Sequence, residues 1–182
     1  MIGRIAGLAA VSAFLSGCAG MMPQPTNWND PVAVASKVTV ESDNFKKTRS
    51  VKGPNCASVF GDSVFLRSVE DQRDPGKSFI QIYVMDYYSD DWRFYHSAYD
   101  SNGNQLDFIS IDREVGSCSK YGCSHYEHMA MNVSRKYLEQ AIATGVSFQV
   151  SGKAGKEQFL IPGGYIQGFL NVLDGKTAAV SQ

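Results

Sequence analysis

Two thiols and two imidazoles gather in one short stretch of the sequence, residues 118–128. Cys118, Cys123, His125 and His128 offer the donor atoms of a tetrahedral zinc site. Their spacing is not that of a common zinc finger or knuckle, however. Residues 125–131 also alternate like a β-strand, which sends His125 and His128 to opposite faces. We therefore assign no metal ligand, and zinc binding by this stretch remains the chemical alternative.

A second candidate for chemistry is the tripeptide Gly61-Asp62-Ser63, which resembles the nucleophile block of the GDSL esterases. In that family an Asp and a His late in the chain accept the proton of the serine. No histidine follows His128 in this sequence, and a serine without a base is an ordinary alcohol. We interpret Ser63 as a turn residue and predict no catalytic residue.

Aromatic side chains are concentrated between residues 83 and 99, which we predict to form a hairpin. The rings belong to Tyr83, Tyr87, Tyr88, Trp92, Phe94, Tyr95 and Tyr99. Exposed rings on a sheet stack on a glycan or on apolar groups of a partner protein. Cross-strand aromatic pairs are also ordinary stabilisers of a sheet.

Strand alternation divides these rings into two sets, because successive residues face opposite sides. Tyr83 and Tyr87 share one face of their strand, and Tyr88 has the other. On the second strand Trp92 and Phe94 are expected on one face, with Tyr95 and Tyr99 opposite. One set must line the core and the other can meet a ligand. We take Tyr83, Tyr87, Trp92 and Phe94 as the candidate ligand-binding residues.

Short strands separated by turn residues position these groups. The predicted strands are residues 32–41, 45–52, 64–69, 79–88, 93–99, 106–115, 125–131, 146–150 and 157–161. Residues 79–88 alternate and are rich in Ile, Val and Tyr, which is typical of a central strand. The Asn102-Gly103 pair favours a hairpin turn between residues 93–99 and 106–115.

Two short helices are predicted in the C-terminal third. Ser134 is placed to cap an apolar stripe that Gly145 ends, and Pro162 and Gly175 bracket the second stripe. The stripes consist of Tyr137, Leu138, Ala141 and Ile142, and of Tyr165, Ile166, Phe169, Leu170 and Leu173. The fold class is therefore mainly β (α+β), an antiparallel β-sandwich or open barrel with two short helices.

Composition sets the limits of function. The chain has 182 residues, with 17 Lys+Arg against 18 Asp+Glu, which suits one globular domain. The balanced charge lacks the basic excess of a nucleic-acid surface, so we expect no nucleic-acid partner.

The N-terminus carries an export signal: Arg4 precedes an apolar run over residues 5–15, which is too short to span a bilayer as a helix. The run closes with Leu15-Ser16-Gly17-Cys18, which resembles the lipobox of bacterial lipoproteins. The resemblance implies cleavage before Cys18 and acylation of that cysteine. Several acyl chains make membrane attachment stable. Ala19, in place of an Asp, implies the outer membrane.

We therefore expect a signal peptide at residues 1–17, an acylated Cys18 with a flexible tether to residue 30, one domain at residues 31–175 and a flexible tail at residues 176–182. Export exposes the domain to an oxidising compartment, which favours a Cys118–Cys123 disulfide. Cys56 leaves the count of unacylated cysteines odd, so pairing of Cys56 with either cysteine competes with that bond.

The expected function is a non-enzymatic binding or envelope-assembly domain, held to the membrane by its acyl chains and facing the periplasm or the cell surface. Its expected partner is an envelope protein or a glycan, and no cofactor is expected. The alternative is an envelope hydrolase or metal-binding protein that uses residues 118–128.

Overall fold

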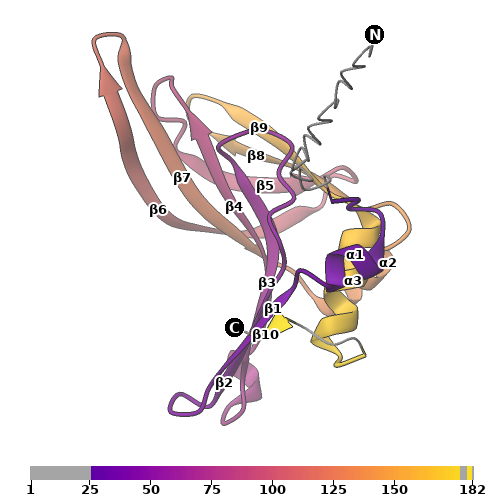
Figure 1. Ribbon diagram of the computed structural model, residues 1–182. Coiled ribbons are helices and arrows are strands. Elements are labelled where there is room, and N and C mark those ends of the chain that lie inside the picture. The colour runs from indigo at the N-terminus through magenta and orange to yellow at the C-terminus, as the bar shows by residue number, and fades with distance from the viewer. Residues whose placement is uncertain (1–25, 177–179, 182) are drawn as a thin grey trace, which may run out of the picture.

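The computed structural model describes residues 26–176 and 180–181 of the chain (Figure 1). One curled sheet holds ten strands in the order β10-β1-β2-β3-β4-β7-β6-β5-β8-β9. The strands are β1 (Thr39–Asp43), β2 (Thr48–Lys52), β3 (Ser63–Asp71), β4 (Phe79–Tyr88), β5 (Tyr95–Asp100), β6 (Gln105–Ser119), β7 (Gly122–Asn132), β8 (Val146–Gly152), β9 (Lys156–Ile161) and β10 (Val180–Ser181). The helices are α1 (Pro31–Ala35), α2 (Arg135–Gln140), α3 (Gly163–Leu173) and the 3-10 helix η1 (Pro75–Lys77).

Neighbouring strands run antiparallel throughout, except that β10 lies parallel to β1. The sheet curls into an open half-barrel, which confirms the predicted mainly β fold and its open-barrel variant. β6 and β7 form a long hairpin whose tip projects from the molecule (Figure 1). β5 joins β6 only at Ala98↔Leu106 and Tyr99↔Gln105. Beyond these pairs the half-barrel is open between β6 and β5.

The core lies between the concave face of the sheet and α3. Tyr165 on α3 is fully buried; its hydroxyl donates to the Pro54 carbonyl at 2.6 Å and accepts from the Leu66 amide at 3.3 Å. α1 packs across α3 at Gly168, where a Cβ would lie 2.6 Å from the Pro31 carbonyl oxygen. The glycine is therefore needed for the close approach of the two helices. Within residues 26–176 no helix is long and apolar enough to cross a membrane.

Several predicted elements are confirmed. β4 coincides with the predicted central strand at residues 79–88, and a turn at residues 101–103 joins β5 to β6. Ser134 caps α2 by accepting from the Tyr137 amide, and Pro162 is the N-cap residue of α3. Gly145 and Gly175 follow the two helices with φ of 78° and 68°, a conformation that glycine adopts without strain.

The predicted strand at residues 32–41 is wrong in its first half, where the structure has α1. The Asp30 side chain accepts from the amides of Val32 and Ala33. Pro31 occupies the first turn, where an amide hydrogen would have no partner within the helix, so its absence costs nothing. The local cap therefore outweighs the apolar alternation of residues 32–35. The tether is also shorter than expected, because Trp28 packs edge-on against Tyr165 at 6.0 Å between ring centroids.

The remaining predicted boundaries lie near the two ends of the chain. β10 lies inside the expected tail and pairs with β1, so the tail is not free along its whole length. The signal peptide and Cys18 lie outside the described residues. Their assignment remains a prediction.

Candidate functional site

The candidate site is the connection between β4 and β5, residues 89–94, at one end of the half-barrel. β7 and β6 lie between β4 and β5 in the sheet, so the predicted hairpin over residues 83–99 is wrong. β4 pairs with β3 and β7, and β5 pairs with β8 and β6. The chain therefore crosses the end of the half-barrel between β4 and β5 instead of folding back on itself.

A buried carboxylate fixes this connection. Glu127 on β7 is 2% exposed. Its two oxygens accept from the amides of Phe94 and Tyr95 at 2.8 and 3.0 Å, from Nε of Arg113 at 2.9 Å and from the hydroxyl of Tyr88. Burial raises the pKa of Glu127, but the hydrogen bonds from Tyr88 and Arg113 outweigh it and hold this pKa below its ordinary value. Glu127 is thus an ionised, fully hydrogen-bonded centre.

A second cluster lies beside it and is organised by Arg93. Nη1 of Arg93 donates to Asp86 at 3.0 Å, to the Tyr95 hydroxyl at 2.8 Å and to Glu157 at 3.2 Å. The guanidinium also lies over the Tyr88 ring, 4.3 Å from its centroid. Burial raises the pKa of Asp86 to about 6, against the hydrogen bond from Tyr95 and the charge of Arg93. These contacts fix both ends of the connection.

The fixed backbone places two aromatic rings near the surface, Phe94 exposed and Trp92 half-buried. Phe94 has φ of 50°, a left-handed conformation that is costly for a bulky residue, and its ring is 41% exposed. Trp92 lies 6.1 Å from Phe94 and 4.2 Å from His125, between ring centroids. The cations of Arg113 and Lys153 lie 5.4 and 5.6 Å from the Phe94 ring centroid. We call Trp92 and Phe94 the aromatic platform.

Close packing against β8 supports the platform from behind. A Cβ on Gly152 would lie 2.1 Å from the Arg93 carbonyl oxygen, so only glycine lets the connection lie this close to the strand. His125, beneath Trp92, is buried, and its Nδ1 has no hydrogen-bond partner among residues 26–176. The platform therefore rests on a buried, closely packed base.

The other two predicted ligand-binding residues lie elsewhere. Tyr83 and Tyr87 share a face of β4 opposite to Tyr88, as alternation predicts. The Tyr83 ring stacks on Phe65 at 4.6 Å, and Tyr87 packs against Tyr126 at 4.9 Å. They belong to the outer face of the sheet and do not join the platform.

The predicted faces of the second strand are wrong. Trp92 and Phe94 precede β5 and lie in the connection. Tyr95 is buried whereas Tyr99 is exposed, although simple alternation puts them on one face. The register shift between Tyr95 and Ser97 explains the difference, because a bulge reverses the alternation that follows it.

The two cysteines and two histidines of residues 118–128 do not lie together in the structure. Cys118 and Cys123 face each other across β6 and β7 and form a disulfide. His125 lies on the concave face, whereas His128 lies on the outer face, where its Nδ1 is hydrogen-bonded to the Tyr83 hydroxyl at 2.7 Å. The part of the chain that the structure describes contains no cluster of three or more potential metal-ligating residues. Residues 118–128 therefore do not converge on one ion.

Cys56 is buried and free in the described structure, and its thiol donates to the Val64 carbonyl at 3.3 Å. Burial raises the pKa of Cys56 to about 12, so almost none of it is thiolate at neutral pH. We expect Cys56 to stay unreactive towards a thiol reagent in the folded protein and to react once the protein is unfolded without reductant. Rapid reaction of the native protein, or a peptide linking Cys56 to Cys118 or Cys123 in a non-reduced digest, contradicts this assignment.

Asp62 follows a turn, but Ser63 is the first residue of β3 and pairs with Met85 on β4, so the interpretation of Ser63 as a turn residue is wrong. Asp62 accepts from the Tyr87 amide at 3.0 Å, and the Asn55 side chain bonds to the backbone of Asp62 and Val64. No histidine of the described region is hydrogen-bonded to Ser63. The nucleophile-and-base geometry of an esterase does not form there.

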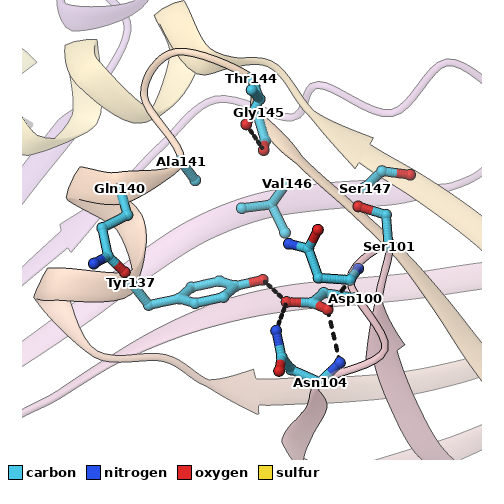
Figure 2. Close-up of a pocket in the computed structure, with 11 residues that line it drawn as sticks. Asp100, Ser101, Asn104, Tyr137, Gln140, Ala141, Thr144, Gly145, Val146 and Ser147 are labelled. Atoms are coloured by element: carbon cyan, nitrogen blue, oxygen red, sulfur yellow. Dashed lines mark hydrogen bonds between the residues drawn. The ribbon is translucent and has the colours of Figure 1, made fainter.

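A hollow of about 350 Å³ lies between α2 and the turn after β5 (Figure 2). The Asp100 carboxylate faces it but is fully engaged. It accepts from the amides of Asn102 and Asn104, from the Asn104 side chain and from the Tyr137 hydroxyl. These bonds fix the turn and α2, so Asp100 has a structural role.

In comparisons with known proteins, no family model, curated protein or solved structure matches the chain.

Proposed function

We propose that the protein is an acyl-anchored lipoprotein of the bacterial cell envelope, with a non-enzymatic domain that binds an envelope protein or a glycan through the aromatic platform. The observation that carries the binding role is the exposed Phe94 ring, held at a positive φ by the hydrogen bonds to Glu127. Strained backbone that its surroundings fix in place is concentrated at functional sites. The anchoring role is supported by the lipobox resemblance at Cys18.

The platform suits a partner with a planar or apolar group and a negative charge beside it. Rings such as Trp92 and Phe94 provide large contact area with little loss of conformational entropy. Arg113 and Lys153 flank the Phe94 ring, and cations at the rim of an apolar surface favour an acidic partner group. A pre-organised surface loses less entropy when it binds.

The binding role is tested by capture from solubilised envelopes. Phe94→Ala and Trp92→Ala are each expected to weaken capture by ~1–2 kcal/mol, or about 5–30-fold, as truncated interface anchors do. Tyr99→Ala is the matched control, because Tyr99 on β5 is 42% exposed and lies outside the platform. The melting temperature of the Phe94 and Tyr99 variants should stay close to that of the wild type. Trp92→Ala also removes packing on buried His125, so its capture is measured well below its own melting temperature. Equal capture by the Phe94 and Tyr99 variants contradicts the role of the platform.

The anchoring role is tested by metabolic labelling with a fatty-acid analogue. Cys18→Ala is expected to abolish the label, because the lipobox places the acyl chains on this residue. Cys56→Ala is the control and should be labelled like the wild type, since its thiol is buried in the core. Undiminished labelling of the Cys18 variant refutes the interpretation of the N-terminus.

A further inference from the structure

We infer that the loop of residues 56–62 docks on the bilayer surface through Val59 and Phe60, so that the folded domain meets the membrane at a second place besides its acyl chains. This inference rests on the proposed acyl anchor. Val59 is 58% exposed and Phe60 is 99% exposed. Adjacent apolar side chains on an interfacial segment bury their hydrocarbon at the boundary between headgroups and acyl chains.

The loop holds these side chains outward. The Asn55 side chain donates to the Asp62 carbonyl at 2.9 Å and accepts from the Val64 amide at 2.8 Å, which closes the loop at its base. Gly61 has φ of 99° and packs so tightly on the Tyr87 ring that a Cβ would lie 2.7 Å from it. The backbone next to Phe60 therefore lies directly on the Tyr87 ring, while the Phe60 side chain itself is almost fully exposed.

The tether enters the domain at the same end as this loop. Trp28 contacts Tyr165, and the Tyr165 hydroxyl donates to the carbonyl of Pro54, just before the loop. Eight steps along the chain separate Cys18 from Thr26, which at about 3.5 Å per residue span at most ~28 Å. The domain is thus held close to the bilayer by the end that carries Val59 and Phe60.

The charges beside the loop suit a lipid headgroup surface. A groove of about 340 Å³ adjoins the base of the loop at Pro54 and Asn55. Its exposed cations are Lys37 and Lys52, and Glu41 is its carboxylate. The net positive charge attracts anionic headgroups, and this attraction acts within a Debye length of the membrane.

The test uses the full acylated chain in vesicles of phosphatidylethanolamine and phosphatidylglycerol, with bromine on the acyl chains as a quencher. Phe60→Trp adds a reporter in the loop. Phe45→Trp is the matched control, because Phe45 is 97% exposed and lies in the β1–β2 turn, at the opposite end of β2 (Figure 1). We expect the emission added at position 60 to be quenched at least twofold and the emission added at position 45 to be unchanged.

The outcomes separate docking from anchoring. Protein that carries acyl chains by mass spectrometry and floats with the vesicles, but shows no quenching at position 60, overturns docking and leaves the anchor intact. Equal quenching at positions 45 and 60 also overturns it, because contact is then not specific to the loop. Protein without acyl chains overturns the anchor and the tether argument together. Weaker quenching at position 60 when phosphatidylcholine replaces phosphatidylglycerol supports the role of Lys37 and Lys52.

Discussion

Replacement of Glu127 by alanine is expected to lower the free energy of unfolding by about 3–5 kcal/mol. The substitution leaves four donors without their acceptor, among them the charged guanidinium of Arg113 and the amides of Phe94 and Tyr95. Removal of one partner from a buried, hydrogen-bonded ion pair costs this much, because the remaining groups are desolvated and unpaired. Urea unfolding followed by circular dichroism measures the change.

Glu114→Ala is the matched control, because Glu114 is an exposed carboxylate on the neighbouring strand with one distant partner, His128, at 3.6 Å. Its loss should cost less than about 1 kcal/mol. Glu127→Gln keeps the shape but loses the charge, and we expect an intermediate effect. If Glu127→Ala costs no more than Glu114→Ala, the carboxylate does not organise the connection between β4 and β5.

The second large effect is a pH dependence of the free energy of unfolding, caused by Asp86. Its pKa is raised from 3.8 to about 6 by burial, with opposing effects of Tyr95 and Arg93. Between these two pH values the folded protein binds more protons at Asp86 than the unfolded chain does. The stability that protonated Asp86 contributes is therefore fully present below pH 3.8 and is lost as the pH rises through 6. The shift corresponds to about 3 kcal/mol.

Asp86→Asn isolates this contribution, because asparagine stays neutral at every pH. The stability of the variant relative to the wild type should rise by about 3 kcal/mol between about pH 3.5 and pH 7. Asp174→Asn provides a control of opposite sign, since the hydrogen bond from Arg135 lowers the pKa of Asp174 to about 2. Relative to the wild type, that variant should lose stability as the pH rises from about 2 to 4, and the difference should change little above about pH 5. If the stability difference between Asp86→Asn and the wild type does not change with pH, the pKa of Asp86 is not raised by burial.

Much of the fold follows from local patterns. The alternation in β4, the Asn-Gly turn before β6 and the caps of α2 and α3 are each encoded within a few residues, and the structure confirms them. α1 escaped prediction because residues 32–35 alternate weakly, and the signal for a helix is the Asp30-Pro31 cap. The separation of β4 from β5 is set by long-range strand order, which no local pattern in residues 83–99 encodes.

The site was predictable only in part. Aromatic density singles out Trp92 and Phe94, but it also groups Tyr83 and Tyr87 with them on the assumption of a hairpin, which the strand order contradicts. The organising residue, Glu127, was missed. A signal for it exists in the sequence, because alternation puts Glu127 on the same face of a predicted strand as Met129 and Met131. A charged residue at a core-facing position needs buried partners, and those partners come from β4, the connection, β5 and β6.

Photo-cross-linking in intact envelopes, with benzoylphenylalanine placed at position 94 or at position 99, tests directly whether the aromatic platform binds a partner. Both sites are about equally exposed, and the reagent reacts with C–H bonds of proteins and glycans alike. If the aromatic platform binds the partner, a discrete cross-linked product forms from position 94 and is absent from position 99. An equal yield of the same product from both positions, or a product from position 99 alone, would contradict binding by the platform.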